Sequence, residues 1–208
     1  MREPAYQSTY AFHMRPRRTK VGVPNMRLMA TTTSGDIATA PSTLGDAGLL
    51  VIRLGVGTMM MHFGLQKFLA FGSTVEEMRS DGWRAPVFAT LLNAGAETLG
   101  GAALILGVLT PLAAAAILGV MLDAWAVNVA HTAFWSDPFN LPFVLGFGAL
   151  GLLLAGAGAY SVDGRLLHRE RWPAPIVAAA LILAVVAGIV VWVVLNGSNP
   201  IHLTTPKG

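Results

Sequence analysis

Five apolar stretches, each close to the ~20 residues that a helix needs to cross ~30 Å of hydrocarbon, constrain the fold of this chain most. They cover residues 47–70, 86–107, 111–134, 141–160 and 173–195. The turn at Thr110-Pro111 is so short that the second and third stretches are expected to be antiparallel neighbours. We therefore predict an all-α integral membrane protein. Residues 47–160 form an antiparallel four-helix transmembrane bundle in this prediction, and residues 173–195 form a fifth transmembrane helix.

The composition excludes a soluble enzyme. Hydrophobic residues make up 54% of the chain and charged residues 12%, about half the charged share of an average soluble domain. So few ionised groups cannot cover a globule of this size. The chain has no cysteine, which excludes disulfides, thiolate metal sites and iron–sulfur clusters built from its own residues.

The charges outside the spans predict an orientation in the membrane. Residues 1–46 carry six Lys and Arg among Pro, Ser, Thr and Gly without an apolar period, which predicts a basic, irregular arm. The loop 161–172 adds three Arg on the same side, and four Lys and Arg lie on the other side, where the tail 196–208 ends. The positive-inside rule places the arm and the loop in the cytoplasm and the tail outside it.

Polar side chains inside the first three spans are the candidate functional residues, because ionisable groups in hydrocarbon are costly. Helical periodicity places Arg53, Gly64 and Lys67 on one stripe of the first span, and Asn93 and Glu97 on one stripe of the second. The candidates for a ligand or proton site are Arg53, His62, Lys67, Asn93, Glu97, Asp123, Tyr160 and Asp163.

The depth of each charge in the membrane predicts how the charges pair. At ~1.5 Å per residue, Arg53 lies roughly 9 Å from the inner edge and Glu97 roughly 16 Å from the outer edge, so Arg53 is the predicted partner of Glu97. Asp123 is expected to share that arginine, and Lys67 is expected to extend toward the outer boundary. Two interpretations stay open, a structural ion network and a ligand or proton site.

Other chemistries find less support in the sequence. A b-type haem would need His62 and His131 at one depth, and their depths differ by about 8 Å. We expect no metal site, no intrinsic cofactor and no nucleic-acid partner. A bound quinone or lipid remains open as a ligand, and the basic arm is expected to face lipid or solvent.

Short motifs in the spans resemble the DoxX family of small integral membrane proteins over about residues 47–163. They are Arg53-Leu-Gly-Val-Gly57, His62-Phe-Gly-Leu-Gln-Lys67, Glu97-Thr-Leu-Gly-Gly101 and Tyr160-Ser-Val-Asp163. The resemblance implies a four-helix membrane fold in a bacterial plasma membrane, with recurrent family positions at Arg53, Lys67, Glu97, Tyr160 and Asp163. The long basic arm and the fifth helix depart from the compact family pattern and look like additions for docking.

Three functions remain open for the chain. Family members include a small membrane subunit of thiosulfate:quinone oxidoreductase and proteins tied to oxidative-stress enzymes. We expect an accessory subunit of a membrane redox or respiratory-chain assembly, with no activity alone, which docks to other membrane subunits through the arm and the fifth helix. The alternative is a quinone-linked oxidoreductase subunit whose buried charges handle protons. The third is a small-molecule carrier, against which stands the absence of an obvious inverted repeat.

Overall fold

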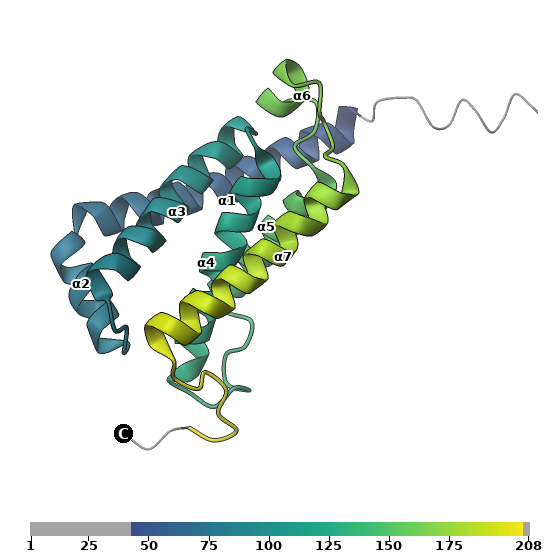
Figure 1. Cartoon of the computed structure of the whole chain (residues 1–208). Helices are drawn as coiled ribbons and strands as arrows, with labels where there is room; N and C mark the ends of the chain where they lie inside the picture. Colours follow the sequence, from purple (N-terminus) through teal and green to yellow (C-terminus); the bar gives the residue numbers. More distant parts are fainter. Residues whose placement is uncertain (1–42, 206–208) are drawn as a thin grey trace, which may run out of the picture. The chain divides into compact units, whose positions relative to one another are not determined.

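The computed structural model describes residues 43–205, and the described part of the chain is helical without a strand (Figure 1). Seven α-helices and one π-helical turn follow one another along the chain. They are α1 (Thr43–Leu69), α2 (Phe71–Ser80), α3 (Pro86–Leu106), α4 (Thr110–Ala130), α5 (Leu141–Ala155), α6 (Val162–Leu166), α7 (Ala174–Val191) and η1 (Trp192–Asn196). This confirms the prediction of an all-α integral membrane fold.

Within residues 43–205, four helices are long and apolar enough to cross a membrane. They are Leu44–Leu69, Pro86–Leu106, Thr110–Ala130 and Ala174–Asn196. The predicted fourth span, 141–160, is a shorter helix that ends at Ala155, about 22 Å long at 1.5 Å per residue. Gly156 and Gly158 end it because both adopt positive φ, +89° and +74°, where glycine is the residue without steric cost.

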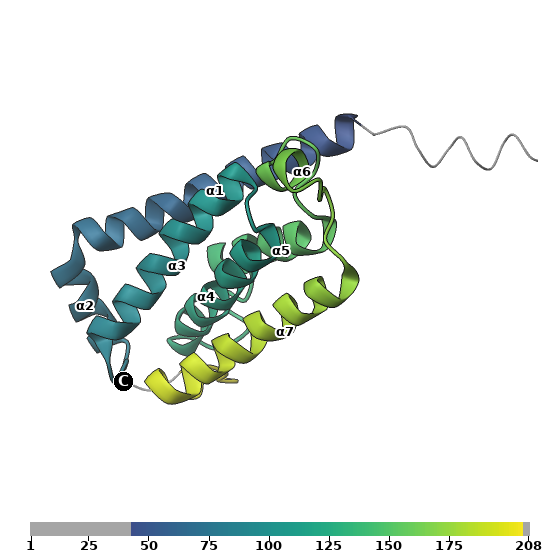
Figure 2. The ribbon, with the colours of Figure 1, turned by 45° about the horizontal axis from the view of Figure 1, so that its top comes forward.

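The long helices run antiparallel between two ends of the bundle (Figure 2). At one end, here called the α6 end, α3 joins α4, α5 leads into α6, and α7 begins. At the other, the α2 end, α1 turns into α2, and α7 passes into η1. The predicted arm, 1–46, lies outside the described residues except for its last four. Those four belong to α1, where Asp46 in the first turn has a favourable interaction with the helix dipole.

The core lies between α1, α3, α4 and α5, and α4 is its central helix. Met60, Leu104, Ile117 and Leu152 are fully buried there. On its other faces α4 packs against α7, where Gly119 and Gly188 bring the two backbones close. Small residues at such crossings let membrane helices approach until their backbones touch.

The fifth helix is fastened to the bundle at the α2 end as well as along α4. The amide of Arg84 donates to the carbonyl of Leu195 at 2.6 Å, and Asn196 Nδ2 donates to the carbonyl of Asp81 at 2.9 Å. The rings of Trp83 and Trp192 meet edge to face at 5.9 Å. The π-helical turn η1 therefore closes on the loop between α2 and α3.

Candidate functional site

A partly buried ion pair between α1 and α3 is the centre of the candidate site. Lys67 Nζ lies 2.6 Å from Glu97 Oε1 and also donates to Asn93 Oδ1. The Glu97 side chain is 2% exposed. Its second oxygen, Oε2, is buried and has no hydrogen-bond partner in the described part of the chain. The cluster thus has an unused acceptor inside the bundle.

The close approach of α1 and α3 puts these side chains together. A Cβ added at Gly64 would lie 2.6 Å from the Thr98 amide nitrogen, and one at Gly101 would lie 2.7 Å from the Gly57 carbonyl. With the backbones in contact at Gly64, the next turn of α1 presents Lys67 to Asn93 and Glu97. The predicted stripes on both helices are therefore confirmed as facing surfaces.

A cavity of about 510 Å³ opens onto this ion pair at the α2 end. Lys67 and Glu97 lie in its wall, beside apolar side chains from α1, α4 and α5 and polar side chains from α2. Its other residues are Phe63, Gln66, Ala70, Ser73, Thr74, Glu77, Met121, Ala124, Leu141, Pro142 and Leu145. The cavity is large enough for a small organic ligand.

Sequence reasoning missed the contribution of α2 to this cavity. Residues 76–82 look like a charged turn between two spans, yet Phe71–Ser80 forms a helix that follows the break at Ala70. The hydroxyls of Ser73 and Thr74 donate to the Ala70 carbonyl at 2.9 and 3.1 Å. This places Ser73, Thr74 and Glu77 in the cavity wall. The sequence signal that could have revealed this helix is the pair Glu76-Glu77 within the ten-residue segment 71–80.

The predicted pair between Arg53 and Glu97 is wrong. Arg53 lies at the α6 end, where Nη1 and Nη2 donate to the carbonyls of Ala157 and Tyr160, each at 2.7 Å. It packs against Gly107, where an added Cβ would lie 2.9 Å from Arg53 Cζ. Gly107 is ten residues from Glu97 along α3, about 15 Å. The register of α1 against α3 therefore pairs Glu97 with Lys67. From the sequence, Lys67 was expected at the outer membrane boundary instead.

Asp163 fastens the same end of the bundle. Its carboxylate accepts hydrogen bonds from the amides of Leu109 and Thr110 at 2.8 and 2.9 Å and from Trp172 Nε1 at 3.1 Å. Leu109 and Thr110 begin α4, and a carboxylate at a helix N-terminus satisfies unpaired N–H groups and favours the dipole. Tyr160 contributes its carbonyl to Arg53. The structure thus places Tyr160 beside Arg53 and Asp163 beside Gly107, at the α6 end and away from Lys67.

Replacing Asp163 with Ala is expected to lower the free energy of unfolding by about 1–2 kcal/mol, because one buried amide, one partly buried amide and an indole N–H lose their acceptor. Thermal unfolding of the full chain in detergent measures the effect. Asp137→Ala is the matched control, because Asp137 is exposed in the loop before α5. Equal unfolding temperatures for the two variants would contradict the capping role.

The remaining predicted residues lie apart from the ion pair. His62 is exposed on α1, and its ring lies 6.0 Å from that of Phe63. Asp123 is buried on another face of α4 and lines a separate groove with α3 and α7. The expectation that Asp123 shares Arg53 is therefore wrong. Within residues 43–205, no group of three or more His, Asp and Glu side chains is placed to hold a metal ion.

Together, the antiparallel apolar helices and the ion pair enclosed between them define a multi-pass α-helical membrane protein. The model of the DoxX family matches residues 48–132. The matched segment runs from α1 to just past the end of α4 and lies within the stretch whose motifs resemble this family. It includes Lys67, Asn93 and Glu97 and stops before Tyr160 and Asp163. Neither the curated proteins nor the solved structures gave a match to the chain.

Proposed function

We propose that this chain is an accessory membrane subunit of a redox or respiratory-chain assembly in a bacterial plasma membrane, and that it binds a small ligand of that assembly at Lys67 and Glu97. The match to the DoxX family model over residues 48–132 supports the first part, because resemblance to this family implies membrane subunits of redox systems. The ion-pair cavity supports the second. An ammonium, a carboxylate and an amide bind polar groups, the ammonium and the carboxylate also exchange protons, and a partner protein would supply the electrons.

The single observation that carries this proposal is that the ion pair is not closed off by protein on the side that faces the cavity. A pair that only fixes helix register is best closed on all sides by protein, because every polar atom left unpaired in a low-dielectric interior is costly. Here Glu97 Oε2 has no partner in the described residues, and the pair faces a cavity of about 510 Å³. The spare oxygen is suited to accept a hydrogen bond from a bound molecule.

A quinone-linked subunit is the second candidate, favoured by the mixed wall of the cavity. Phe63, Met121 and Leu145 offer an apolar surface to a ring, and Lys67 and Glu97 offer a donor and an acceptor at its edge. Reduction of a quinone to a quinol takes two electrons and two protons. In this proposal the electrons come from a partner protein, and the protons pass through Glu97.

The test is to purify the native complex in mild detergent from cells carrying the wild-type chain or Glu97→Gln. Co-migrating redox proteins in the wild type, with a ligand that is lost in Glu97→Gln, would support the proposal. Stoichiometric quinone in the extract would favour the quinone-linked candidate. A chain that migrates alone and carries no small molecule would contradict both.

We further propose that the α6 end faces the cytoplasm. Arg165, Arg169 and Arg171 lie there, whereas the α2 end has Glu76, Glu77 and Asp81 beside Arg79 and Arg84. Positive charges favour the cytoplasmic side. The basic arm would then meet partner subunits or anionic lipid on that side. The exposed apolar face of α7 would meet lipid or another helix within the membrane.

A reporter fused after Gly208 is expected to be active only if it functions outside the cytoplasm, and one inserted after Arg169 only if it functions inside. The loop that contains Arg169 lies at the α6 end, and η1, after which the chain continues toward its last residues, lies at the α2 end. Paired alkaline phosphatase and fluorescent-protein fusions at each site measure the orientation. Cytoplasmic activity of the fusion after Gly208 would overturn the assignment.

A further inference from the structure

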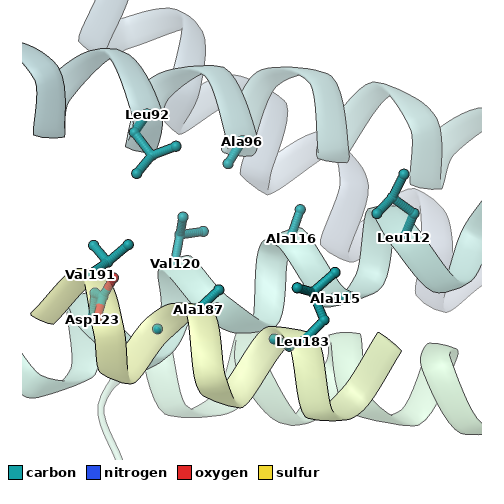
Figure 3. Close-up of a pocket in the computed structure, with 13 residues that line it drawn as sticks. Leu92, Ala96, Leu112, Ala115, Ala116, Val120, Asp123, Leu183, Ala187 and Val191 are labelled. Carbon is teal, nitrogen blue, oxygen red and sulfur yellow. The ribbon is translucent and has the colours of Figure 1, made fainter. Parts of the chain in front are cut away.

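A second hollow lies on a different face of α4 from the ion-pair cavity. It is a groove of about 270 Å³, floored by α4 and flanked by α3 and α7 (Figure 3). Leu92 and Ala96 of α3 lie on one side, and Leu183 and Val191 of α7 lie on the other. The groove exists because α3 and α7 both pack on α4, which carries small residues such as Ala116 between them. Its walls are almost wholly apolar.

Asp123 gives this apolar groove one polar end. The residue is 6% exposed, and its carboxylate points into the groove near Val191 (Figure 3). In the part of the chain that the structure describes, the carboxylate has no ion pair or hydrogen bond. Asp123 lies seven residues before the end of α4 at Ala130, about 10 Å along the helix. A carboxylate at such depth in an apolar span is costly without a partner, and this indicates a ligand function.

The size of the groove limits which kind of molecule it can hold. A volume of about 270 Å³ corresponds to roughly nine groups of the size of water, at ~30 Å³ each. A single hydrocarbon chain of about that many carbons has this volume, and a helix ~10 Å across does not enter it. From Leu112 to Asp123 the groove runs along about 16 Å of α4, which suits an extended chain.

We propose that this groove binds one single-chain amphiphile, with an alkyl or prenyl chain along α4 and a hydroxyl or ammonium group hydrogen-bonded to Asp123. The chain fills the space between α3 and α7 that their packing on α4 leaves open. The polar end gives the buried carboxylate the donor that the described residues do not provide. This site is separate from the Lys67–Glu97 cavity and does not depend on the function proposed for it.

The probe is decylamine that carries a photoactivatable diazirine on its chain, added to the full-length protein in phosphatidylcholine vesicles. We expect saturable labelling of Leu92, Val120 and Leu183, competed by unlabelled decylamine and decanol but not by decane. Asp123→Asn should raise the half-saturating concentration of decylamine about tenfold. That factor corresponds to about 1.4 kcal/mol, near the lower end for a hydrogen bond to a charged group.

Two further variants test the groove itself. Ala116→Phe should abolish saturable labelling by filling the space, whereas Ala179→Phe, on an exposed turn of α7, should leave it unchanged. Tryptophan fluorescence during heating checks that each variant is folded. Labelling that never saturates, or an Asp123→Asn variant with unchanged affinity, would overturn the proposal. So would cross-links showing a partner helix seated in the groove of the native assembly.

Discussion

Gly64→Ala is expected to lower the free energy of unfolding by about 3 kcal/mol, near the upper end of the usual cost of overpacking. The added Cβ would lie 2.6 Å from the Thr98 amide nitrogen and 2.8 Å from the Ala94 carbonyl. Both are backbone atoms in the middle of α3, so no side-chain rotation relieves the clash. The two helices must move apart along their whole contact. Thermal unfolding of the full chain in detergent measures the loss.

Gly55→Ala is the matched control for this substitution. Gly55 lies on the same helix and has nothing within 4 Å of an added Cβ. Alanine has a higher helix propensity than glycine by ~1 kcal/mol in water, so this variant should be as stable as the wild type or slightly more so. If Gly64→Ala matched Gly55→Ala, the close contact of α1 and α3 would be refuted. Because Gly64→Ala moves α1 away from α3, it should also break the ion pair between Lys67 and Glu97.

The faces of the helices could be predicted from the sequence, but their register could not. Helical periodicity alone puts Gly64 and Lys67 on one side of α1, and Asn93 and Glu97 on one side of α3. Which residue lies opposite which depends on where the backbones touch, at Gly57 with Gly101 and at Gly64 with Ala94 and Thr98. Depth estimated from the ends of the spans placed Arg53 too close to Glu97, and so gave Glu97 the wrong cation.

The short elements at the two ends also escaped the sequence analysis. Residues 156–160, Gly-Ala-Gly-Ala-Tyr, carry no charged side chain, so hydropathy alone extends the fourth span to Tyr160. The positive φ of Gly156 and Gly158 instead turns this segment into a loop whose carbonyls bind Arg53. The helix α2 was hidden for the opposite reason, because its charges resemble those of a turn. Both elements contribute to sites that periodicity in the long spans does not reveal.

Breaking the ion pair between Lys67 and the buried Glu97 is expected to have the other large effect. Lys67→Met leaves the Glu97 carboxylate without its cation, and Glu97→Gln leaves the ammonium without its anion. Each should lower the free energy of unfolding by about 3 kcal/mol, the cost of an unpaired charge in a membrane span. The double variant has no orphan charge, so its loss should be smaller than the sum of the single losses by at least ~1 kcal/mol. Thermal unfolding of the four proteins in detergent measures this coupling.

The same cycle with Arg53→Met and Glu97→Gln is the control. Arg53 binds the carbonyls of Ala157 and Tyr160, about 15 Å from Glu97 along α3, so its losses should add to those of Glu97→Gln within ~0.5 kcal/mol. Additive losses for Lys67 and Glu97, or coupled losses for Arg53 and Glu97, would contradict the register of α1 and α3. The double variant of Lys67 and Glu97 then separates structure from function. If it recovers stability but the native assembly loses its ligand or its activity, the pair is a binding site; if both survive, the pair only holds α1 and α3 in register.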